Sequence, residues 1–547
     1  MNQKHFSGRP LSRPQLTWPA VTLLASLFIV LFDNRLFWSS LFSKLGPGLS
    51  ADWPLPLLAG VILLLLLNLV FTLVAFRWVL KPFVAIILLL CAGISYFADT
   101  FGVIVDPSMI HNILETDVAE ASELLTWPLV WHFVLYAGLP ISLLLLVKVR
   151  YSGWPREVLM RGGVLIGSLV LVAGLGFANY QKISFFAREH RDLRMYINPT
   201  FAIHSLKKAI KTNYFTHTEE PLRAIARDAT RSDHSPRKVV VLVLGETARA
   251  QSFSLDGYPR NTNPRLSQEA VINFPNVASC GTSTAESLPC LFSPMERNNY
   301  SRSDALRSEN LLDILSQTGV KVVWLDNDSG SKGVAKRVVY KDLAHQKVPQ
   351  LCSSDNCFDG ILLKELESVL TSTTEDTFVI LHTKGSHGPS YYKRTPPEFK
   401  EFLPECAQDD VQDCSPQEVV NAYDNTIVYT DYILSEVINR LKEQDLDAAM
   451  LYLSDHGESL GENGLYLHGL PYALAPEEQT HVPMIFWATE KFFTDEQINR
   501  QALVNARQQS YSHDNLFHSI LDIFDIKTEL YNPELDMFSM SRSSARS

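Results

Sequence analysis

Five long apolar segments occupy the first third of this chain and constrain its fold more than any other feature. Most are close to the ~20 residues that an α-helix needs to cross a membrane, and the first is the shortest. Buried core helices can have the same composition, but five such segments in series favour a membrane bundle. The segments are Trp18–Phe32, Leu55–Phe76, Phe83–Val103, Trp127–Val147 and Gly162–Tyr180.

Basic residues between the apolar segments predict which side of the membrane each loop faces. Lys and Arg occur in the loops after the second and fourth segments, whereas residues 104–126 contain neither. Because basic loops stay in the cytoplasm, the N-terminus is expected inside and everything after Tyr180 outside, which is the periplasm of a bacterium. The polar stretch before the first segment is followed by no cleavage site, so an uncleaved inner-membrane anchor is expected. The basic loop residues are Arg77, Lys81, Lys148, Arg150, Arg156 and Arg161.

Beyond residue 180 the composition changes to that of a soluble α/β protein. We expect a five-helix transmembrane domain at 1–180, a juxtamembrane linker with amphipathic helices at 181–237, and a catalytic α/β domain at 238–547. Continuous β-branched and apolar runs indicate strands buried on both faces, and helical stretches between them favour a mostly parallel sheet. The predicted strands are Val239–Leu244, Val320–Leu325, Phe378–Leu381, Ala448–Leu453 and Met484–Trp487, and the clearest helices are Leu311–Gln317 and Thr426–Lys442.

Charge and cysteine content exclude some partners and favour an oxidising compartment. The net charge of −11 argues against a nucleic-acid partner. Of seven cysteines, Cys91 lies in an apolar segment and six lie in the soluble half, as expected for disulfides. Fifteen pairings are possible, and we prefer the local one. It joins Cys280 to Cys290, Cys352 to Cys357 and Cys406 to Cys414.

Polar side chains follow each predicted strand, where parallel sheets form their binding sites. The first strand is followed by Glu246 and the fourth by Asp455 and His456, with Glu458 and His468 close behind. Such carboxylates and imidazoles suit zinc or manganese. Helix capping by Glu246 and a hydrogen-bonded turn at Asp455 and His456 are the structural alternatives. The second strand ends in Asp326-Asn-Asp328 before Lys332, and the third ends in His382 before His387; solvated or satisfied loop residues are the alternative here.

A short loop between Cys280 and Cys290 contains three consecutive hydroxyl side chains, namely Thr282, Ser283 and Thr284. A hydroxyl is inert at neutral pH unless a base or a metal activates it. A hydroxyl from this loop would complete a four-ligand site with the strand-end residues. A disulfide-pinned structural turn is equally compatible with the loop by itself. Ser283 and Glu286 have the spacing of a capping box that would start a helix at Thr284.

The ordered motifs of the soluble half resemble those of the lipid A phosphoethanolamine transferases, which include the mobile colistin-resistance enzymes and belong to the alkaline phosphatase and sulfatase superfamily. The motifs are Gly245–Arg249, Ser279–Ala285, Gly385–Pro389 and Ser454–Gly461. The resemblance implies an alkaline phosphatase/sulfatase-like fold. It also implies that Thr284 receives phosphoethanolamine and binds a tight zinc ion together with Glu246, Asp455 and His456.

The resemblance further implies substrate contacts. His387, His468, Lys332 and Glu458 become contacts for a substrate phosphate or a second zinc ion. Asn112, Thr116 and Glu120, spaced to share one face of a short helix, become contacts for the phosphatidylethanolamine headgroup. Family members often carry a Cys-Lys-Gly-x-Cys loop where this chain has Ser331-Lys-Gly-Val-Ala335, which implies a less constrained Lys332.

The expected function is zinc-dependent transfer of phosphoethanolamine from phosphatidylethanolamine to a lipid A phosphate by a monomeric membrane enzyme. Such a transfer lowers the negative charge of the outer membrane and weakens binding of polymyxins and other cationic peptides. Two alternatives are transfer to lipopolysaccharide core sugars and phosphoglycerol transfer as in lipoteichoic acid synthases. A membrane sensor or transporter is a further alternative, disfavoured by the complete ligand set and by the few charges within the apolar segments.

Overall fold

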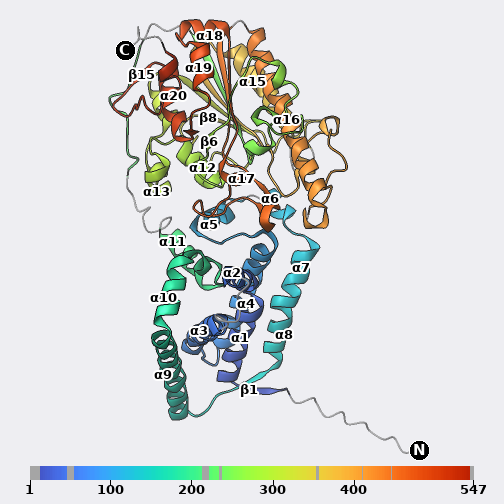
Figure 1. The fold of residues 1–547 in the computed structure, drawn as a ribbon, viewed down its shortest axis with the longest axis vertical. Helices are drawn as coiled ribbons and strands as arrows, with labels where there is room; N and C mark the ends of the chain where they lie inside the picture. The colour runs from blue at the N-terminus through green and yellow to red at the C-terminus, as the bar shows by residue number, and fades with distance from the viewer. Residues whose placement is uncertain are drawn as a thin grey trace, which may run out of the picture. The chain divides into compact units, whose positions relative to one another are not determined.

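The computed structural model describes residues 13–45, 54–116, 118–211, 221–232, 237–352, 357–409, 411–444 and 446–542, with the backbone alone at 118–120. The chain forms two compact units, each considered by itself below (Figure 1). The first unit takes the chain up to Asp106 together with Trp127–Ser205. The second takes Pro107–Thr126 and the chain from Leu206 onward. The loop between the third and fourth apolar segments therefore belongs to the second unit.

Apolar helices make up the first unit, as predicted. Among the described residues, four helices are long and apolar enough to cross a membrane, or five if the bent pair α1 and α2 counts as one span. These two helices meet at 57°. The predicted membrane bundle is thus confirmed. Its helices are α1 (Trp18–Phe32), α2 (Arg35–Leu45), α3 (Pro54–Leu73), α4 (Leu80–Phe101), the continuous α7, η1 and α8 (Trp127–Phe133, Val134–Gly138 and Leu139–Leu146), and α9 (Trp154–Ala178).

Helix α9 begins well before the predicted start at Gly162. Pro155 suits the first turn of a helix, and the Arg, Leu and Met residues that follow are good helix formers. The guanidinium of Arg161 lies over the rings of Trp18 and Phe76, at 5.3 and 4.4 Å from their centroids. These contacts account for a basic residue inside the helix, a position where apolarity alone predicted a loop.

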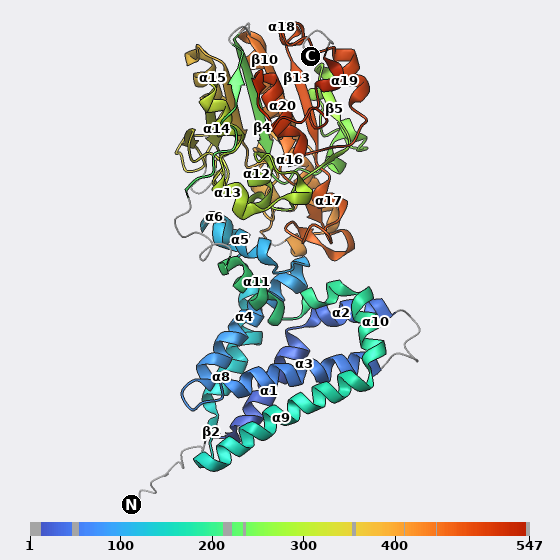
Figure 2. The ribbon, with the colours of Figure 1, turned by 90° about the vertical axis from the view of Figure 1, so that its left-hand side faces the viewer.

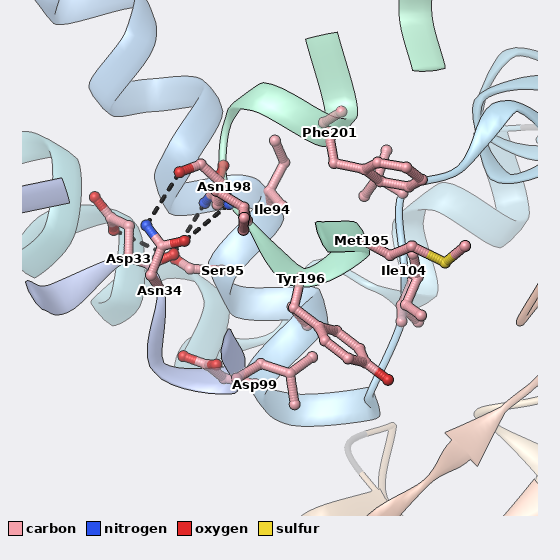
Figure 3. Close-up of a pocket in the computed structure, with 16 residues that line it drawn as sticks. Asp33, Asn34, Ile94, Ser95, Asp99, Ile104, Met195, Tyr196, Asn198 and Phe201 are labelled. Atoms are coloured by element: carbon pink, nitrogen blue, oxygen red, sulfur yellow. Dashed lines mark hydrogen bonds between the residues drawn. The ribbon is translucent and has the colours of Figure 1, made fainter. Parts of the chain in front are cut away.

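Buried polar side chains hold the bend between α1 and α2 (Figure 3). The backbone N–H of Asn198 donates to Asn34 Oδ1 at 2.8 Å, and the Asn34 amide donates to the Asn198 carbonyl at 3.0 Å. The Asn198 side chain also donates to the carbonyls of Asp33 and Cys91, at 3.1 and 3.0 Å. Because buried amides are costly without partners, this network fixes the bend against α4.

Three short helical elements follow α9, which are α10 (Tyr180–Glu189), η2 (Arg191–Tyr196) and α11 (Thr200–Ile210). They lie where amphipathic linker helices were expected. The later part of the predicted linker differs, because β3 (Thr230–Arg231) pairs antiparallel with β15 (Ile526–Lys527). That part is therefore joined to the second unit by backbone hydrogen bonds.

A seven-stranded, mostly parallel sheet forms the centre of the second unit, and this confirms the predicted fold class. Its order is β5-β13-β10-β4-β9-β7-β8, in which β13 runs antiparallel to both of its neighbours, β10 and β5. The edge strands β5 and β8 were not predicted, because they are short and β8 is exposed and polar. The strands are β4 (Lys238–Gly245), β5 (Ile272–Phe274), β7 (Lys321–Asp326), β8 (Val339–Asp342), β9 (Thr377–His382), β10 (Asp447–Ser454) and β13 (Met484–Ala488).

Helices cover both faces of this sheet, as the fully buried β4 requires. Alternate residues of β4, beginning with Val240, pack in one core with α12 (Thr284–Leu291), α14 (Leu311–Gln317) and α20 (Asp514–Ile523). The helices α15 (Gly360–Ser372) and α16 (Pro416–Glu443) contact each other and the sheet and lie along the other side (Figures 1 and 2).

Strand register brings the carboxyl ends of β4, β7, β9 and β10 to one edge of the sheet. Gly245 pairs with Ser454, so Glu246 and Asp455 follow neighbouring strands at the same level. His382 pairs with Leu244 on one side and with Asp326 on the other. Side chains distant in sequence therefore meet at this edge.

The three locally paired disulfides that were predicted are present in the second unit. They join Cys280 to Cys290, Cys352 to Cys357 and Cys406 to Cys414, and Cys91 is free and buried. The first of these links the start of the hydroxyl-rich loop to α12.

Replacing Lys238 should destabilise the second unit strongly. This first residue of β4 is fully buried, and its ammonium pairs with Glu496, lies 3.1 Å from Asp525, and donates to the Ile523 carbonyl at 2.7 Å. Lys238→Met removes the cation and leaves buried carboxylates behind, which costs about 3–5 kcal/mol. Thermal unfolding of the full chain in detergent would show this as a lower midpoint.

A matched control is Lys341→Met on β8, which breaks a half-exposed ion pair between Lys341 and Glu365 of α15. Exposed pairs contribute about 0–1 kcal/mol, so this variant should unfold close to the parent. Equal midpoints for the two variants would contradict the assigned role of Lys238.

Candidate metal and nucleophile site

The hydroxyl of Thr284, the first residue of α12, faces the carboxylate of Glu246. It lies 3.1 Å from each carboxylate oxygen and can donate to either. Glu246 is fully buried and Thr284 is 7% exposed. The Thr282 hydroxyl is directed elsewhere, because it donates to the Leu470 carbonyl at 2.6 Å. Of these two threonines, the structure places only Thr284 beside an acidic side chain from a strand end.

Asp455 and His456 complete a cluster around the Thr284 hydroxyl. His456 Nε2 lies 3.4 Å from Thr284 Oγ1, 3.4 Å from Glu246 Oε1 and 3.3 Å from Asp455 Oδ2. One ligand atom from each of the three acidic and imidazole residues lies within 4.8 Å of the others. Adjacent residues of a strand would face opposite ways, but this pair lies in the turn after β10, where both can face one point.

The donor atoms of this cluster fit a divalent metal ion. Asp455 Oδ2 is buried and accepts no hydrogen bond, while Oδ1 accepts from the backbone N–H groups of Thr247 and His456. His456 Nδ1 lies 3.0 Å from the Gly457 carbonyl, which can only accept, so a neutral ring presents the Nε2 lone pair to the cluster. A second partner that fixes the ring of a ligating histidine is typical of metal sites.

A second potential ligand set shares Glu246 and was not assigned from the sequence. It adds Asp328 and His382, whose ligand atoms also lie within 4.8 Å of one another. His382 Nε2 is buried without a hydrogen-bond partner, and Nδ1 lies 3.0 Å from Asp326 Oδ2. Trp324 Nε1 donates to the same oxygen at 2.6 Å. The signal was available, because both residues directly follow strand ends.

Lysine and histidine side chains offset part of the negative charge in this second set. Lys384 Nζ lies 3.0 Å from Asp328 Oδ1. Burial works against the Asp328 carboxylate, but Lys384 and His382 hold its pKa well below the usual range. Burial and the Lys384 charge lower the pKa of His387 to about 3, so its imidazole is neutral at physiological pH.

The two histidines nearest Glu246 experience a strongly negative environment. Burial by itself would lower their pKa values. The carboxylates of Asp455 and Glu246 nevertheless raise the pKa of His456 to about 10. The pKa of His382 rises to about 9, mainly through Asp326. The site therefore favours positive charge between these side chains.

Three further predicted residues lie beside the cluster. His468 Nδ1 lies 2.7 Å from Glu458 Oε2, and Tyr391 donates to the other Glu458 oxygen at 2.7 Å. The ring of His468 lies 4.4 Å from that of His456 and 5.7 Å from that of His387, measured between centroids. Two imidazoles and a buried carboxylate therefore flank the cluster around the Thr284 hydroxyl.

The remaining predicted residues are placed less directly. Lys332 donates to the hydroxyl and carbonyl of Ser329 at 2.8 and 3.0 Å, and its charge acts on Asp328. Asn112 lies in α5 (Pro107–Glu115), but Thr116 follows the end of that helix.

The expectation that Asn112, Thr116 and Glu120 share one face of a single helix is wrong, because the chain forms two helices there. The second is α6 (Val118–Glu123), in which the side chain of Glu120 lies outside the described residues. The Thr116 hydroxyl donates to the carbonyl of Asn112 at 2.7 Å, closing the last turn of α5 instead of continuing the helix.

The predicted capping box at the start of α12 is also wrong. Ser283 is the N-cap, but its side chain makes no capping hydrogen bond and its hydroxyl is buried without a partner. The helix starts instead through backbone hydrogen bonds from Glu286 and Ser287 to the Ser283 carbonyl, at 3.1 and 2.8 Å.

His513 joins the loop that precedes Thr284 to the end of β10. Its Nδ1 accepts from the Cys280 N–H at 3.1 Å, and its Nε2 donates to the Ser454 carbonyl at 2.9 Å. Together with the disulfide between Cys280 and Cys290, this bridge fixes Thr284 relative to Asp455. Sequence analysis did not single out His513, which lies far along the chain.

Glu246→Gln should weaken divalent metal binding, because Glu246 belongs to both potential ligand sets. Loss of a single outer partner already costs about 10–100-fold in metal affinity, and loss of a ligand charge should cost at least ~100-fold. Metal content after dialysis, measured by elemental mass spectrometry, tests this. The control Glu365→Gln, a carboxylate paired at the surface, should keep the parental content; equal contents in both variants would contradict the assignment.

Comparisons with known proteins agree with the two-part organisation. The sulfatase family model matches residues 238–526, and the model of the phosphoethanolamine transferase EptA/EptB family matches residues 63–214. The chain is 37% identical over 546 residues to phosphoethanolamine transferase EptA of Escherichia coli strain K12, covering 98% of this chain and 99% of that one. It is 37% identical over 470 residues to phosphatidylethanolamine transferase Mcr-1 of Escherichia coli, covering 83% and 85%.

A solved structure is similar over nearly the whole chain. The integral membrane protein lipooligosaccharide phosphoethanolamine transferase A (EptA) of Neisseria meningitidis superposes with a TM-score of 0.93. It is 37% identical and covers 97% of this chain and 100% of its own.

Proposed function

This chain belongs to the EptA family of phosphoethanolamine transferases, and we propose that it moves phosphoethanolamine from phosphatidylethanolamine to a lipid A phosphate through a covalent adduct on Thr284. One observation carries the assignment of the nucleophile. The Thr284 hydroxyl lies 3.1 Å from both oxygens of buried Glu246, at the edge of the sheet where Asp455 and His456 converge. The relatives that act on phosphatidylethanolamine and lipooligosaccharide support the donor and the class of acceptor.

In the first step, Thr284 Oγ1 attacks the phosphorus of phosphatidylethanolamine. The bond from the threonine oxygen to phosphorus forms, and the bond from phosphorus to the diacylglycerol oxygen breaks. Glu246 is placed to take the threonine proton, because both its oxygens are within hydrogen-bonding distance. His468, held by Glu458, is placed to give a proton to the departing diacylglycerol oxygen.

In the second step, a protonated oxygen of a lipid A phosphate attacks the same phosphorus and passes its proton to His468, which gave one up in the first step. The bond from phosphorus to Thr284 breaks, and the threonine oxygen regains the proton held by Glu246. Donor and acceptor are thus used in turn at one nucleophile, which is the usual advantage of covalent catalysis. The product lipid carries an added ammonium group, so the outer membrane loses net negative charge and should bind cationic peptides such as polymyxins less tightly.

The residues that would hold a zinc ion are Glu246, Thr284, Asp455 and His456. When bound, zinc would lower the pKa of the hydroxyl and offset negative charge on phosphoryl oxygens. Carboxylate, imidazole and hydroxyl donors of this kind suit zinc, and the unpartnered Asp455 Oδ2 supports a bound cation. His387, Glu458, His468 and Lys332 are proposed contacts for substrate phosphate or for a second zinc ion.

The donor headgroup is proposed to bind between the nucleophile cluster and the residues Asn112, Thr116 and Glu120. The close approach of Asn112 to Gly469, next to His468, supports this placement. We further propose that the second unit acts in the periplasm and that the enzyme is a monomer. Three disulfides and the basic cytoplasmic loops support the periplasmic location.

Thr284→Ala should abolish transfer, because no other hydroxyl of the loop faces Glu246. We expect at least a ~10³-fold loss of rate, as for removal of other catalytic nucleophiles. Mass spectrometry of lipid A from cells that express each variant measures the added phosphoethanolamine. Thr284→Ser keeps a hydroxyl and should retain measurable transfer.

Persistent modification of lipid A by Thr284→Ala would refute the covalent step. Phosphoethanolamine on core sugars, with lipid A unmodified by the parent enzyme, would refute the proposed acceptor and leave the nucleophile assignment standing.

A further inference from the structure

The segment 107–126 belongs to the second unit, which carries the candidate site, although membrane-spanning helices flank the segment in sequence. Its helix α5 contacts α12, the helix that begins with Thr284. Both ribbon views show α5 and α6 (blue) beside the part of the second unit that contains α12 and α13 (Figures 1 and 2). Two arginines of the second unit pair with the last residues of the two short helices of this segment.

Arg302 bridges α5 to the nucleophile loop. It is the first residue of α13 (Arg302–Arg307), and its Nε donates to the Ala285 carbonyl at 2.8 Å. Its Nη2 pairs with the carboxylate of Glu115, the last residue of α5. One guanidinium thus joins the end of α5 to the residue next to Thr284.

Arg394 makes an equivalent bridge to α6, the second short helix of the segment. Its Nε donates to the His387 carbonyl at 2.8 Å, and its Nη2 pairs with Glu123 at 2.6 Å. Both side chains are almost fully buried, at 2% and 6% exposure. Glu123 is the last residue of α6, so this guanidinium joins the end of α6 to the turn that carries His387.

The side chain of Met109 in α5 lies against the backbone of Gly469. A Cβ atom added to Gly469 would lie 2.5 Å from Met109 Cε and 3.8 Å from Asn112 Nδ2. Gly469 follows His468 and has a φ of +87°, which also favours glycine. The segment therefore meets the loops of Thr284, His387 and His468.

The two bridges have the same construction. In each, one guanidinium uses separate nitrogens for a carboxylate of the segment and for a backbone carbonyl of a site loop. A planar guanidinium can hold both acceptors at fixed directions, whereas a lysine ammonium on a flexible stem cannot replace that geometry. Two such bridges tie the last residues of α5 and α6 to loops of the candidate site.

We propose that Arg302 and Arg394 are positioning residues that hold the segment 107–126 as one wall of the donor site and set its distance from Thr284. The ligand concerned is the zwitterionic headgroup of a phospholipid. The inference rests on the proposed function, because it assumes that the segment contacts the donor. It adds that recognition of the donor headgroup depends on two ion pairs outside the reacting groups.

The test compares Arg302→Gln, Glu115→Gln and the double variant in the full chain, with fluorescent phosphatidylethanolamine in mixed micelles as donor. Each single variant should raise the KM for the donor about 10-fold and leave kcat within about twofold. The double variant should be no worse than either single one, because both changes remove the same bridge. Arg302→Lys should recover only part of the affinity.

Arg440→Gln is the matched control, because it breaks an ion pair with Glu436 that joins two residues of the same helix, α16. It should leave KM unchanged. For the second bridge, Glu123→Gln is preferred to a change of the buried Arg394, and the same rise in KM is expected. Metal content and thermal midpoint identify any variant that is misfolded.

An unchanged KM in well-folded Arg302→Gln would overturn the proposal, as would additive effects in the double variant or a loss confined to kcat. Failure of the proposed function has a separate signature. If Thr284→Ala retained transfer, the covalent step would be lost, while the KM comparison in chains that keep Thr284 would still decide the role of the bridges.

Discussion

Four carboxylates are buried together where the parallel strands of the sheet end, and their mutual repulsion is the constraint that the surrounding structure must satisfy. Glu246, Asp326, Asp328 and Asp455 follow three different strands, and strand register leaves them no freedom to separate. Buried like charges are costly unless cations or hydrogen bonds compensate them. Lys384 and the raised pKa values of two histidines supply part of that compensation. A divalent cation beside Glu246 is the remaining contribution that the geometry favours.

The same edge explains how an ordinary threonine could serve as the proposed nucleophile. Thr284 reaches Glu246 only because the loop before α12 is fixed on two sides, by the disulfide from Cys280 and by His513. His513 lies more than two hundred residues away in sequence and contacts the end of β10 with its other nitrogen. A hydroxyl held this closely loses little entropy when it attacks, which is the general benefit of preorganised catalytic groups.

The boundary between the two units does not coincide with the boundary between apolar and polar sequence. Residues 107–126 connect two membrane-spanning helices, yet their carboxylates pair with Arg302 and Arg394 of the catalytic unit. A segment with no Lys or Arg of its own carries acidic residues at the ends of both short helices, and these meet partly buried Arg302 and buried Arg394. The proposed donor recognition and the proposed chemistry therefore share one compact unit.

The sequence alone was sufficient for the membrane helices, the mostly parallel sheet and the polar residues that meet at the strand ends, because the apolar pattern and the position after a strand are local properties. The roles of these polar residues as metal ligands stay predictions. Edge strands such as β8 were not predicted from the sequence, because a short exposed strand lacks an apolar pattern. Resemblance to a family, and not spacing, selected Thr284 among the three consecutive hydroxyl residues 282–284. Only the tertiary structure added His382 and Asp328 to the site, broke the 112–120 segment into two helices, and showed the bridges made by Arg302 and Arg394. The second ligand set depends on which strands lie side by side. Each bridge joins an arginine to a carboxylate 187 or 271 positions away, so a local pattern does not specify these contacts.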